Sequence, residues 1–291
     1  MNQVHVDSFQ DASAALRHPD LAQCMYDAGA VVMDQVLLSL HGEAHRVRRL
    51  LEFRVFRKNF FAYYEHEVFP PTLEATRELA TRIGYVRETI FGGMWDFTAN
   101  LAFKDTAYTS AAIGPHTDGT YSFDSPGYQM FHCLQFDGSG GESTLVDGFK
   151  VAEQIRTSDP AAFEALSTVK VPAQYLGDGV HLRAEHPVIG LDHDGDFVQI
   201  AYNNYDRAPF NLPRPRMTTF YRALKLFNEL INDPANEITM RLAPGTALLF
   251  DNWRTLHGRR AYQGYRRLCG AYLNKEDFES KLRVLRSAAN R

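Results

Sequence analysis

Two short stretches decide the fold that we expect: Pro-His-Thr-Asp at residues 115–118 and, far downstream, Asp-Asn-Trp-Arg-Thr-Leu-His at residues 251–257. A His and a carboxylate two residues apart on an extended strand point to the same face of a sheet. A second His from a distant strand can then complete the two-His, one-carboxylate triad that holds non-haem Fe(II) and leaves other positions open. An H-x-D tripeptide alone is more often a turn with an exposed His. The two halves together predict an Fe(II) site at His116, Asp118 and His257.

The composition narrows the class of protein. A chain of 291 residues fits one large domain or one domain with an appended segment. A net charge of -4 gives no indication of a nucleic acid or an anionic membrane as partner. The three cysteines form no C-x-x-C pair, which argues against a disulfide framework or a structural zinc site. Without a secretory leader or a long apolar run, we expect a soluble cytoplasmic protein.

The first 85 residues are predicted to be a helical N-terminal segment of unknown role. Apolar residues recur at helical spacing over residues 37–61, and a further helix is expected over residues 72–83 with Thr72 as its N-cap. Ser13 is a candidate N-cap for a short helix that Pro19 should end.

Residues 86–291 are predicted to form a second unit, which carries both metal-binding stretches. Short strand-like runs alternate there with Gly, Pro and Asp turns, and helices are expected between and after them. The strands are expected at residues 127–136, 143–146, 197–202, 246–250 and 268–273, and the helices at 149–166 (broken near Pro160), 216–231 and 275–289. This pattern favours a mainly β protein with flanking helices, whose core is a double-stranded β-helix, or jelly roll.

Arginines follow the second His, at residues 259–260 and 266–267. A keto acid bound to the metal carries a second carboxylate, which a guanidinium can hold through two parallel hydrogen bonds. We assign that role to Arg266, assisted by the hydroxyl of Ser143. Some of the other arginines are simply solvated.

Four aromatic residues flank the two halves of the site: Phe91, Trp95, Tyr108 and Tyr272. Aromatic faces around a pocket bind quaternary ammonium groups by cation–π attraction, worth roughly 0.5 to 2 kcal/mol per ring. Taken singly, such residues are more often part of a core, so composition leaves both interpretations open.

The order of several motifs resembles a known family, the γ-butyrobetaine and trimethyllysine dioxygenases of the carnitine pathway, and is closer to the trimethyllysine branch. The likeness covers roughly residues 85–288. The motifs are residues 93–98, 105–109, 116–118, 131–134, 140–149, 202–207, 251–259 and 264–270.

The resemblance implies a jelly-roll dioxygenase that uses Fe(II), 2-oxoglutarate and O2 to hydroxylate a trimethylammonium substrate. It implies that His116, Asp118 and His257 are the iron ligands and that Arg266 holds 2-oxoglutarate. By this resemblance, the four aromatic residues match the family's cage for the trimethylammonium head. Asn203 matches a family residue that contacts the other end of the substrate.

Asp105 favours one substrate within this family. The butyrobetaine enzymes carry Asn at the matching position, whereas a carboxylate attracts the α-ammonium group of an amino acid and repels a bare carboxylate tail. We therefore expect Nε-trimethyllysine, hydroxylated at C3, as the substrate. γ-Butyrobetaine and a trimethylammonium phosphonate are the alternatives within the class.

The N-terminal segment departs from the family, whose small β-rich module shapes the substrate entrance and the dimer. A homodimer is thus a weaker expectation here. A metal-binding homologue without turnover and a zinc hydrolase with the same triad remain the alternatives outside the class.

Overall fold

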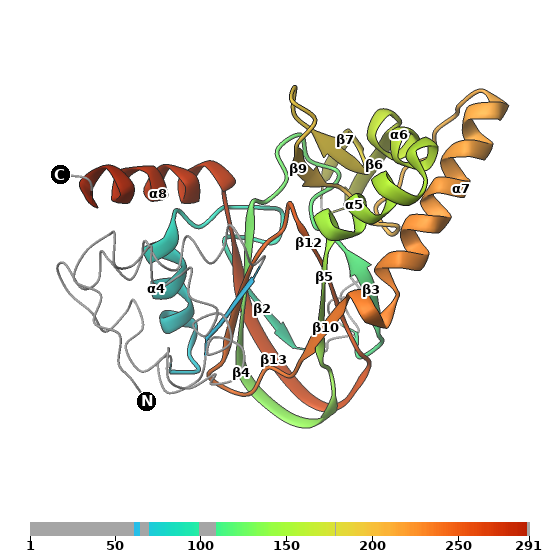
Figure 1. The fold of residues 1–291 in the computed structure, drawn as a ribbon. Coiled ribbons are helices and arrows are strands. Elements are labelled where there is room, and N and C mark those ends of the chain that lie inside the picture. The colour runs from blue at the N-terminus through green and yellow to red at the C-terminus, as the bar shows by residue number, and fades with distance from the viewer. Residues whose placement is uncertain (1–60, 65–69, 99–108, 178, 290–291) are drawn as a thin grey trace, which may run out of the picture.

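The structure is a computed structural model that describes residues 61–64, 70–98, 109–177 and 179–289. Its centre is a pair of facing antiparallel sheets (Figure 1). The larger sheet has the order β1-β11-β4-β13-β2, with β1 Phe61–Tyr64, β11 Ala247–Asp251, β4 Tyr128–Gly140, β13 Tyr262–Leu273 and β2 Met94–Thr98. The smaller sheet has the order β10-β5-β12-β3, with β10 Glu237–Met240, β5 Ser143–Asp147, β12 Thr255–Arg259 and β3 Ile113–His116.

The space between the sheets is filled by apolar side chains from both of them. Leu145 of the smaller sheet packs with Leu248 and Phe250 of the larger one, and all three are almost fully buried. Together with the antiparallel pairing, this two-sheet arrangement confirms the predicted mainly β jelly roll.

A second core lies beneath a layer of helices at one end of the sheets (Figure 1). The helices of this layer are α5 Gly148–Ser158, α6 Pro160–Thr168, α7 Arg214–Ile231 and the short 3-10 helix η2 Pro234–Asn236. Two hairpins accompany them: β6 Lys170–Gly177 pairs with β7 Val180–Pro187, and β8 Ile189–Leu191 pairs with β9 Phe197–Ile200. The predicted break at Pro160 is present. Asp159 ends α5 and caps α6, accepting a hydrogen bond from the backbone N–H of Ala162.

Two further helices, α4 Leu73–Ile83 and α8 Lys275–Ala289, pack on the larger sheet through a third apolar cluster. The Thr72 hydroxyl accepts a hydrogen bond from the backbone N–H of Ala75, which confirms the predicted N-cap of α4. Thr76 joins this helix to the sheet, because its hydroxyl lies 2.7 Å from both His132 Nδ1 and Cys269 Sγ.

The helix predicted for residues 37–61 lies outside the described residues except for Phe61, where the prediction is wrong. Phe61 begins strand β1 and pairs with Phe250 of β11. Aromatic residues favour strands, and a neighbouring strand supplies the hydrogen bonds that the helical pattern could not anticipate. The helix expected to begin after Ser13 also lies outside the described residues.

Strands β4 and β13 continue together well beyond the predicted ends, as a long two-stranded ribbon. Glycines permit this close pairing: Gly264 has φ +93°, and a Cβ there would meet the carbonyl oxygen of Asp137 at 2.2 Å. Because glycine weakens the strand signal in a sequence, this half of the ribbon was not predicted.

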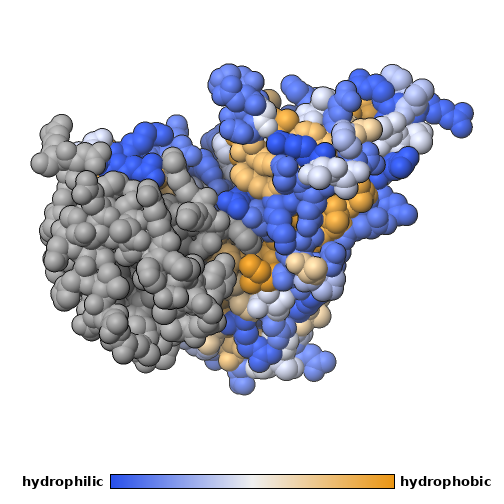
Figure 2. Space-filling model, in the orientation of Figure 1, coloured by the Kyte–Doolittle hydropathy of each residue, from blue (hydrophilic) through white to orange (hydrophobic). Residues whose placement is uncertain are grey.

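Within the described part of the chain, no helix is both long and apolar enough to cross a membrane. On the face drawn in Figure 2, hydrophilic residues surround scattered apolar patches.

Candidate metal centre

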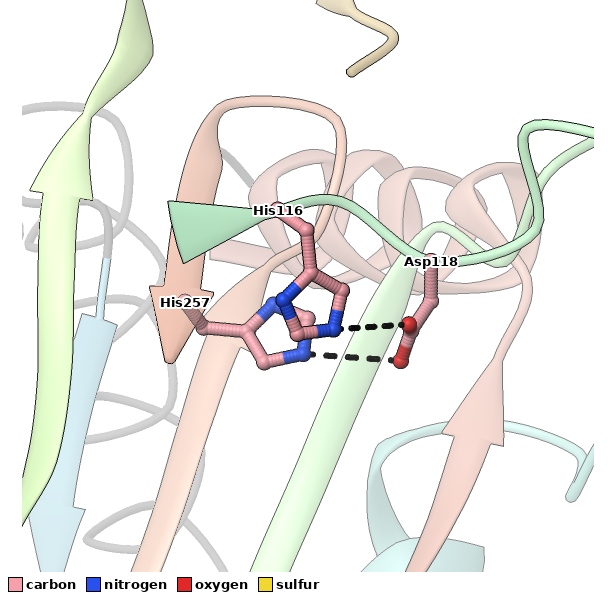
Figure 3. A group of neighbouring side chains, drawn as sticks. All are labelled: His116, Asp118 and His257. Atoms are coloured by element: carbon pink, nitrogen blue, oxygen red, sulfur yellow. Dashed lines mark ion pairs between the residues drawn. The ribbon is translucent and has the colours of Figure 1, made fainter. Parts of the chain in front are cut away.

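The three predicted ligands meet at one end of the smaller sheet (Figure 3). His116 is the last residue of β3, and His257 of β12 is its direct cross-strand partner. Asp118 lies in the loop that follows β3, rather than on the strand as expected. The loop nevertheless positions the Asp118 carboxylate next to both imidazole rings.

The ligand atoms form a compact group, all within 4.8 Å of one another. His116 Nε2 lies 3.3 Å from Asp118 Oδ1, and His257 Nε2 lies 3.5 Å from Asp118 Oδ2. The imidazole centroids are 4.3 Å apart. Figure 3 shows one nitrogen of each ring turned toward the carboxylate.

Asn252 fixes the position of the Asp118 loop. Its side-chain oxygen accepts from the backbone N–H of Asp118 at 2.9 Å, and its Nδ2 donates to the carbonyls of Asp118 and Pro126. Thr117 adds two hydrogen bonds with the backbone of Tyr202. Asn252 is only 1% exposed, so these bonds are shielded from competing water. Asn252 belongs to one of the two stretches that define the site, but nothing in the sequence indicated this role.

The electrostatics of the triad favour a cation between its members. For Asp118, burial opposes ionisation, yet the neighbouring His257 and His116 hold its pKa well below the usual value. Burial also opposes protonation of His116, but the hydrogen bond and charge of Asp118 outweigh it and raise the pKa of His116. For His257, burial and the charge of His116 lower the pKa.

The donor set fits a divalent metal of intermediate softness. His116 Nδ1 lies 2.9 Å from the carbonyl oxygen of Gly114, so it can donate there and leave Nε2 free as a ligand. Two imidazole nitrogens and one carboxylate are the facial set used for non-haem Fe(II). Nδ1 of His257 is buried and has no hydrogen-bond partner within the described part of the chain.

Arg266 lies on the face of β13 that also carries Leu268, Gly270 and Tyr272, because alternate residues of a strand share a face. Its guanidinium is largely buried beside the Tyr262 ring, 5.6 Å from the centroid. Burial, followed by repulsion from Arg259, lowers the pKa of Arg266 to about 10. Among the described residues no carboxylate forms an ion pair with Arg266. A partly buried guanidinium without a carboxylate partner among the described residues can bind an anion.

Ser143 is the first residue of β5 and is buried opposite Arg259 of β12. The neighbouring turn approaches the predicted anion site, since a Cβ at Gly141 would come within 3.5 Å of the Arg266 side chain. Ser143 therefore lies two residues along the chain from Gly141, the glycine that approaches the Arg266 side chain.

Two of the predicted aromatic residues come together beside the triad. Trp95 of β2 and Tyr272 of β13 have ring centroids 5.0 Å apart and planes at 62°. The absence of a side chain at Gly270 makes room for the indole, which a Cβ there would meet at 2.1 Å. The Tyr272 hydroxyl donates to Asp118 Oδ2 at 2.7 Å, so this pair directly adjoins the metal ligands.

Phe91 contacts a different ring, Tyr175, at 6.0 Å, and Tyr175 in turn lies 5.5 Å from Tyr121. Tyr108 and Asp105 lie outside the described residues, and their roles remain predictions.

Asn203 lies in a polar cluster with Asp206 and Thr120. Its Nδ2 donates to Asp206 Oδ2 at 2.9 Å, and the Thr120 hydroxyl donates to the same oxygen at 3.2 Å. Asp206 also acts electrostatically on His116. Sequence reasoning missed Asp206, although it stands in the same motif as Asn203.

A family model described as "Taurine catabolism dioxygenase TauD, TfdA family" matches residues 29–272. The chain is 41% identical over 233 residues to a protein named trimethyllysine dioxygenase from Meyerozyma guilliermondii, covering 78% of this chain and 58% of that protein. It is 42% identical over 238 residues to the human protein named mitochondrial trimethyllysine dioxygenase, covering 79% of this chain and 56% of that protein. The human γ-butyrobetaine dioxygenase is 36% identical over 217 residues, covering 72% of this chain and 56% of that protein.

Solved structures support the fold. A taurine dioxygenase from Burkholderia xenovorans superposes with a TM-score of 0.61 at 16% identity, covering 82% of this chain and 84% of that one. An asparagine oxygenase also has a TM-score of 0.61, at 17% identity, covering 78% of this chain and 79% of that one. The chain spans only 56–58% of the length of the three relatives named above.

Proposed function

Because this chain belongs to the TauD/TfdA family of dioxygenases, we propose that it is an Fe(II)- and 2-oxoglutarate-dependent hydroxylase of trimethylammonium substrates. Its preferred substrate in this proposal is Nε-trimethyllysine, hydroxylated at C3. One observation carries the proposal: a partly buried two-His, one-carboxylate group adjoins an aromatic pair, Trp95 and Tyr272, through the hydrogen bond from Tyr272 to Asp118.

Each part of the site has a distinct task in this proposal. The triad holds the metal, and Arg266 holds the distal carboxylate of 2-oxoglutarate, since no carboxylate in the described part of the chain forms an ion pair with it. When bound, iron with 2-oxoglutarate and O2 would supply the oxidation: the keto acid loses carbon dioxide and takes up one atom of O2 to give succinate, and the other atom enters a C–H bond of the substrate as a hydroxyl group. The protein determines which C–H bond is within reach.

The aromatic residues orient the substrate. The faces of Trp95 and Tyr272 suit a trimethylammonium head, which an aromatic ring attracts without needing a hydrogen bond. Tyr108 and Phe91 are proposed to complete the cage. Asp105 is proposed to hold the α-ammonium group at the other end, assisted by Asn203.

A second candidate substrate, γ-butyrobetaine, is favoured by the 36% identity to the human enzyme of that name. The two substrates differ at the end far from the quaternary nitrogen, where one carries an α-ammonium group and the other only a carboxylate. Exchanging Asp105 for Asn should therefore shift the preference toward γ-butyrobetaine.

The decisive experiment supplies Fe(II), 2-oxoglutarate and oxygen together with trimethyllysine, γ-butyrobetaine or a trimethylammonium phosphonate. Mass spectrometry should detect a product heavier by one oxygen atom from trimethyllysine, with one succinate formed per product. The His257→Ala variant is the matched control, since it removes one ligand and should abolish both products. Succinate formation that no quaternary amine stimulates would contradict the substrate class.

Two alternatives outside this class give different results in the same preparation. A metal-binding homologue without turnover binds Fe(II) but consumes no 2-oxoglutarate. A zinc hydrolase gives no visible charge-transfer band when Fe(II) and 2-oxoglutarate are added without oxygen, whereas a 2-oxoglutarate oxygenase does.

The compartment and the assembly are also proposals. The human relative is named as mitochondrial, and a cytoplasmic location for this chain remains the expectation from its sequence. A homodimer is proposed only by analogy with the family, and light scattering of the purified protein tests it.

A further inference from the structure

The hydroxyl of Tyr272 donates a 2.7 Å hydrogen bond to Oδ2 of Asp118. The two residues come from different parts of the fold. Tyr272 belongs to β13 of the larger sheet, whereas Asp118 follows β3 of the smaller sheet. This bond therefore joins the larger sheet to the loop that carries the metal-binding carboxylate.

The bond leaves the two carboxylate oxygens in different environments. Oδ1 faces His116 Nε2 at 3.3 Å, while Oδ2 accepts the Tyr272 hydroxyl and lies 3.5 Å from His257 Nε2. We propose that Tyr272 is a positioning residue for the metal: its hydroxyl holds Oδ2, so that Asp118 offers Oδ1 alone as a ligand.

One-point ligation matters for the chemistry that the site is proposed to perform. A carboxylate that binds through both oxygens occupies two positions of the metal, whereas a facial triad must leave three positions open. Hydrogen bonds to ligating groups commonly set this orientation, and their loss costs 10- to 100-fold in metal affinity or activity. The hydroxyl of Tyr272 performs this task from a fixed position, because the side chain is only 8% exposed and packs on Trp95.

The ring and the hydroxyl of Tyr272 thus have separable tasks. The ring task, which rests on the proposed function, is to face the quaternary ammonium group beside Trp95. The hydroxyl task concerns the metal alone and needs no substrate. The simpler interpretation is that a buried Tyr hydroxyl merely finds an acceptor and stabilises the fold. A measurement of metal affinity distinguishes this purely structural role from the proposed positioning role.

The test uses the Tyr272→Phe variant, which keeps the ring and removes the hydroxyl. Co(II) serves as the probe, titrated into metal-free protein without oxygen and followed by its visible absorption. Tyr265→Phe is the matched control, because Tyr265 is a half-exposed tyrosine on the same strand. We expect Co(II) affinity to fall about 10-fold in Tyr272→Phe, with a shifted absorption spectrum, and to stay at the wild-type value in Tyr265→Phe.

A purely structural role for the hydroxyl gives a different result: Tyr272→Phe then melts at a lower temperature but binds Co(II) with wild-type affinity and spectrum. That result overturns the proposal, as does an equal loss of affinity in both variants or a wild-type protein that binds no Co(II). If Tyr272→Phe does not fold, Tyr272→Met provides the same comparison, with the same affinity loss expected. A wild-type protein that binds Co(II) but hydroxylates no quaternary amine refutes the proposed function and leaves this inference standing.

Discussion

Replacing Arg266 by Lys tests the proposed 2-oxoglutarate site most directly. The substitution keeps a positive charge but removes the planar fork that can bind a carboxylate through two parallel bonds. A hydrogen bond to a charged group is worth about 1.5 to 3 kcal/mol, and each 1.4 kcal/mol corresponds to a tenfold change in affinity. The loss of one such bond should therefore weaken 2-oxoglutarate binding roughly 10- to 150-fold.

The surroundings of Arg266 add a second, pH-dependent effect. Burial and repulsion from Arg259 lower the pKa of Arg266 to about 10, so wild-type Arg266 stays protonated at neutral pH. A Lys begins about 2 to 3 units below an Arg. The same surroundings therefore bring the pKa of the introduced ammonium group toward neutral pH, and binding in the variant should weaken further as the pH rises.

The assay is an oxygen-free titration of Fe(II)-loaded protein with 2-oxoglutarate, followed by the charge-transfer band at about pH 7 and about pH 9. Arg267→Lys is the control: Arg267 is the next residue of the strand, points to the opposite face and forms an ion pair with Asp96. Its affinity should stay within about twofold of wild type. An Arg266→Lys variant with wild-type affinity at both pH values would refute the assignment of Arg266.

Three further predictions concern hydrogen bonds within the fold and the charge of the triad. Asn252→Ala removes one acceptor and two donated bonds from the Asp118 loop, so it should destabilise the protein by about 2 to 3 kcal/mol in urea unfolding and weaken metal binding. Thr76→Val should cost about 1 to 3 kcal/mol in the same assay while leaving metal affinity unchanged, because it removes the contacts of the Thr76 hydroxyl with the buried His132 and Cys269 and none of the hydrogen bonds described around the triad. Metal affinity should decrease as the pH falls below the raised pKa of His116, since a proton then occupies the imidazole.

The features that the sequence predicted well are those specified by neighbouring residues. Thr72 caps its helix, and Pro160 begins one where the spacing placed a break. The meeting of the two metal-binding stretches was also predicted, because each half is recognisable from its own motif. The fold that brings them together then followed from the alternation of short strands and turns.

The features that were missed depend on contacts between distant strands. The role of the Tyr272 hydroxyl could not be predicted, because its acceptor lies on a loop of the facing sheet. Asn252 belongs to the downstream sequence motif, yet its three hydrogen bonds depend on the Asp118 loop packing against it, which the motif alone does not predict. Strand β1 was missed since Phe61 lies at the end of a helical pattern and acquires its partner from β11.

The direct pairing of His116 with His257 has a consequence for biosynthesis. During translation the first imidazole leaves the ribosome long before the second, and no metal can be held until β12 has joined β3. Iron loading therefore comes after most of the chain has been made, and a metal ion bound at this site reports that β12 has paired with β3 in the smaller sheet. Nascent chains stalled before β12 should carry no iron, which would protect the cell from a partly formed centre reacting with oxygen.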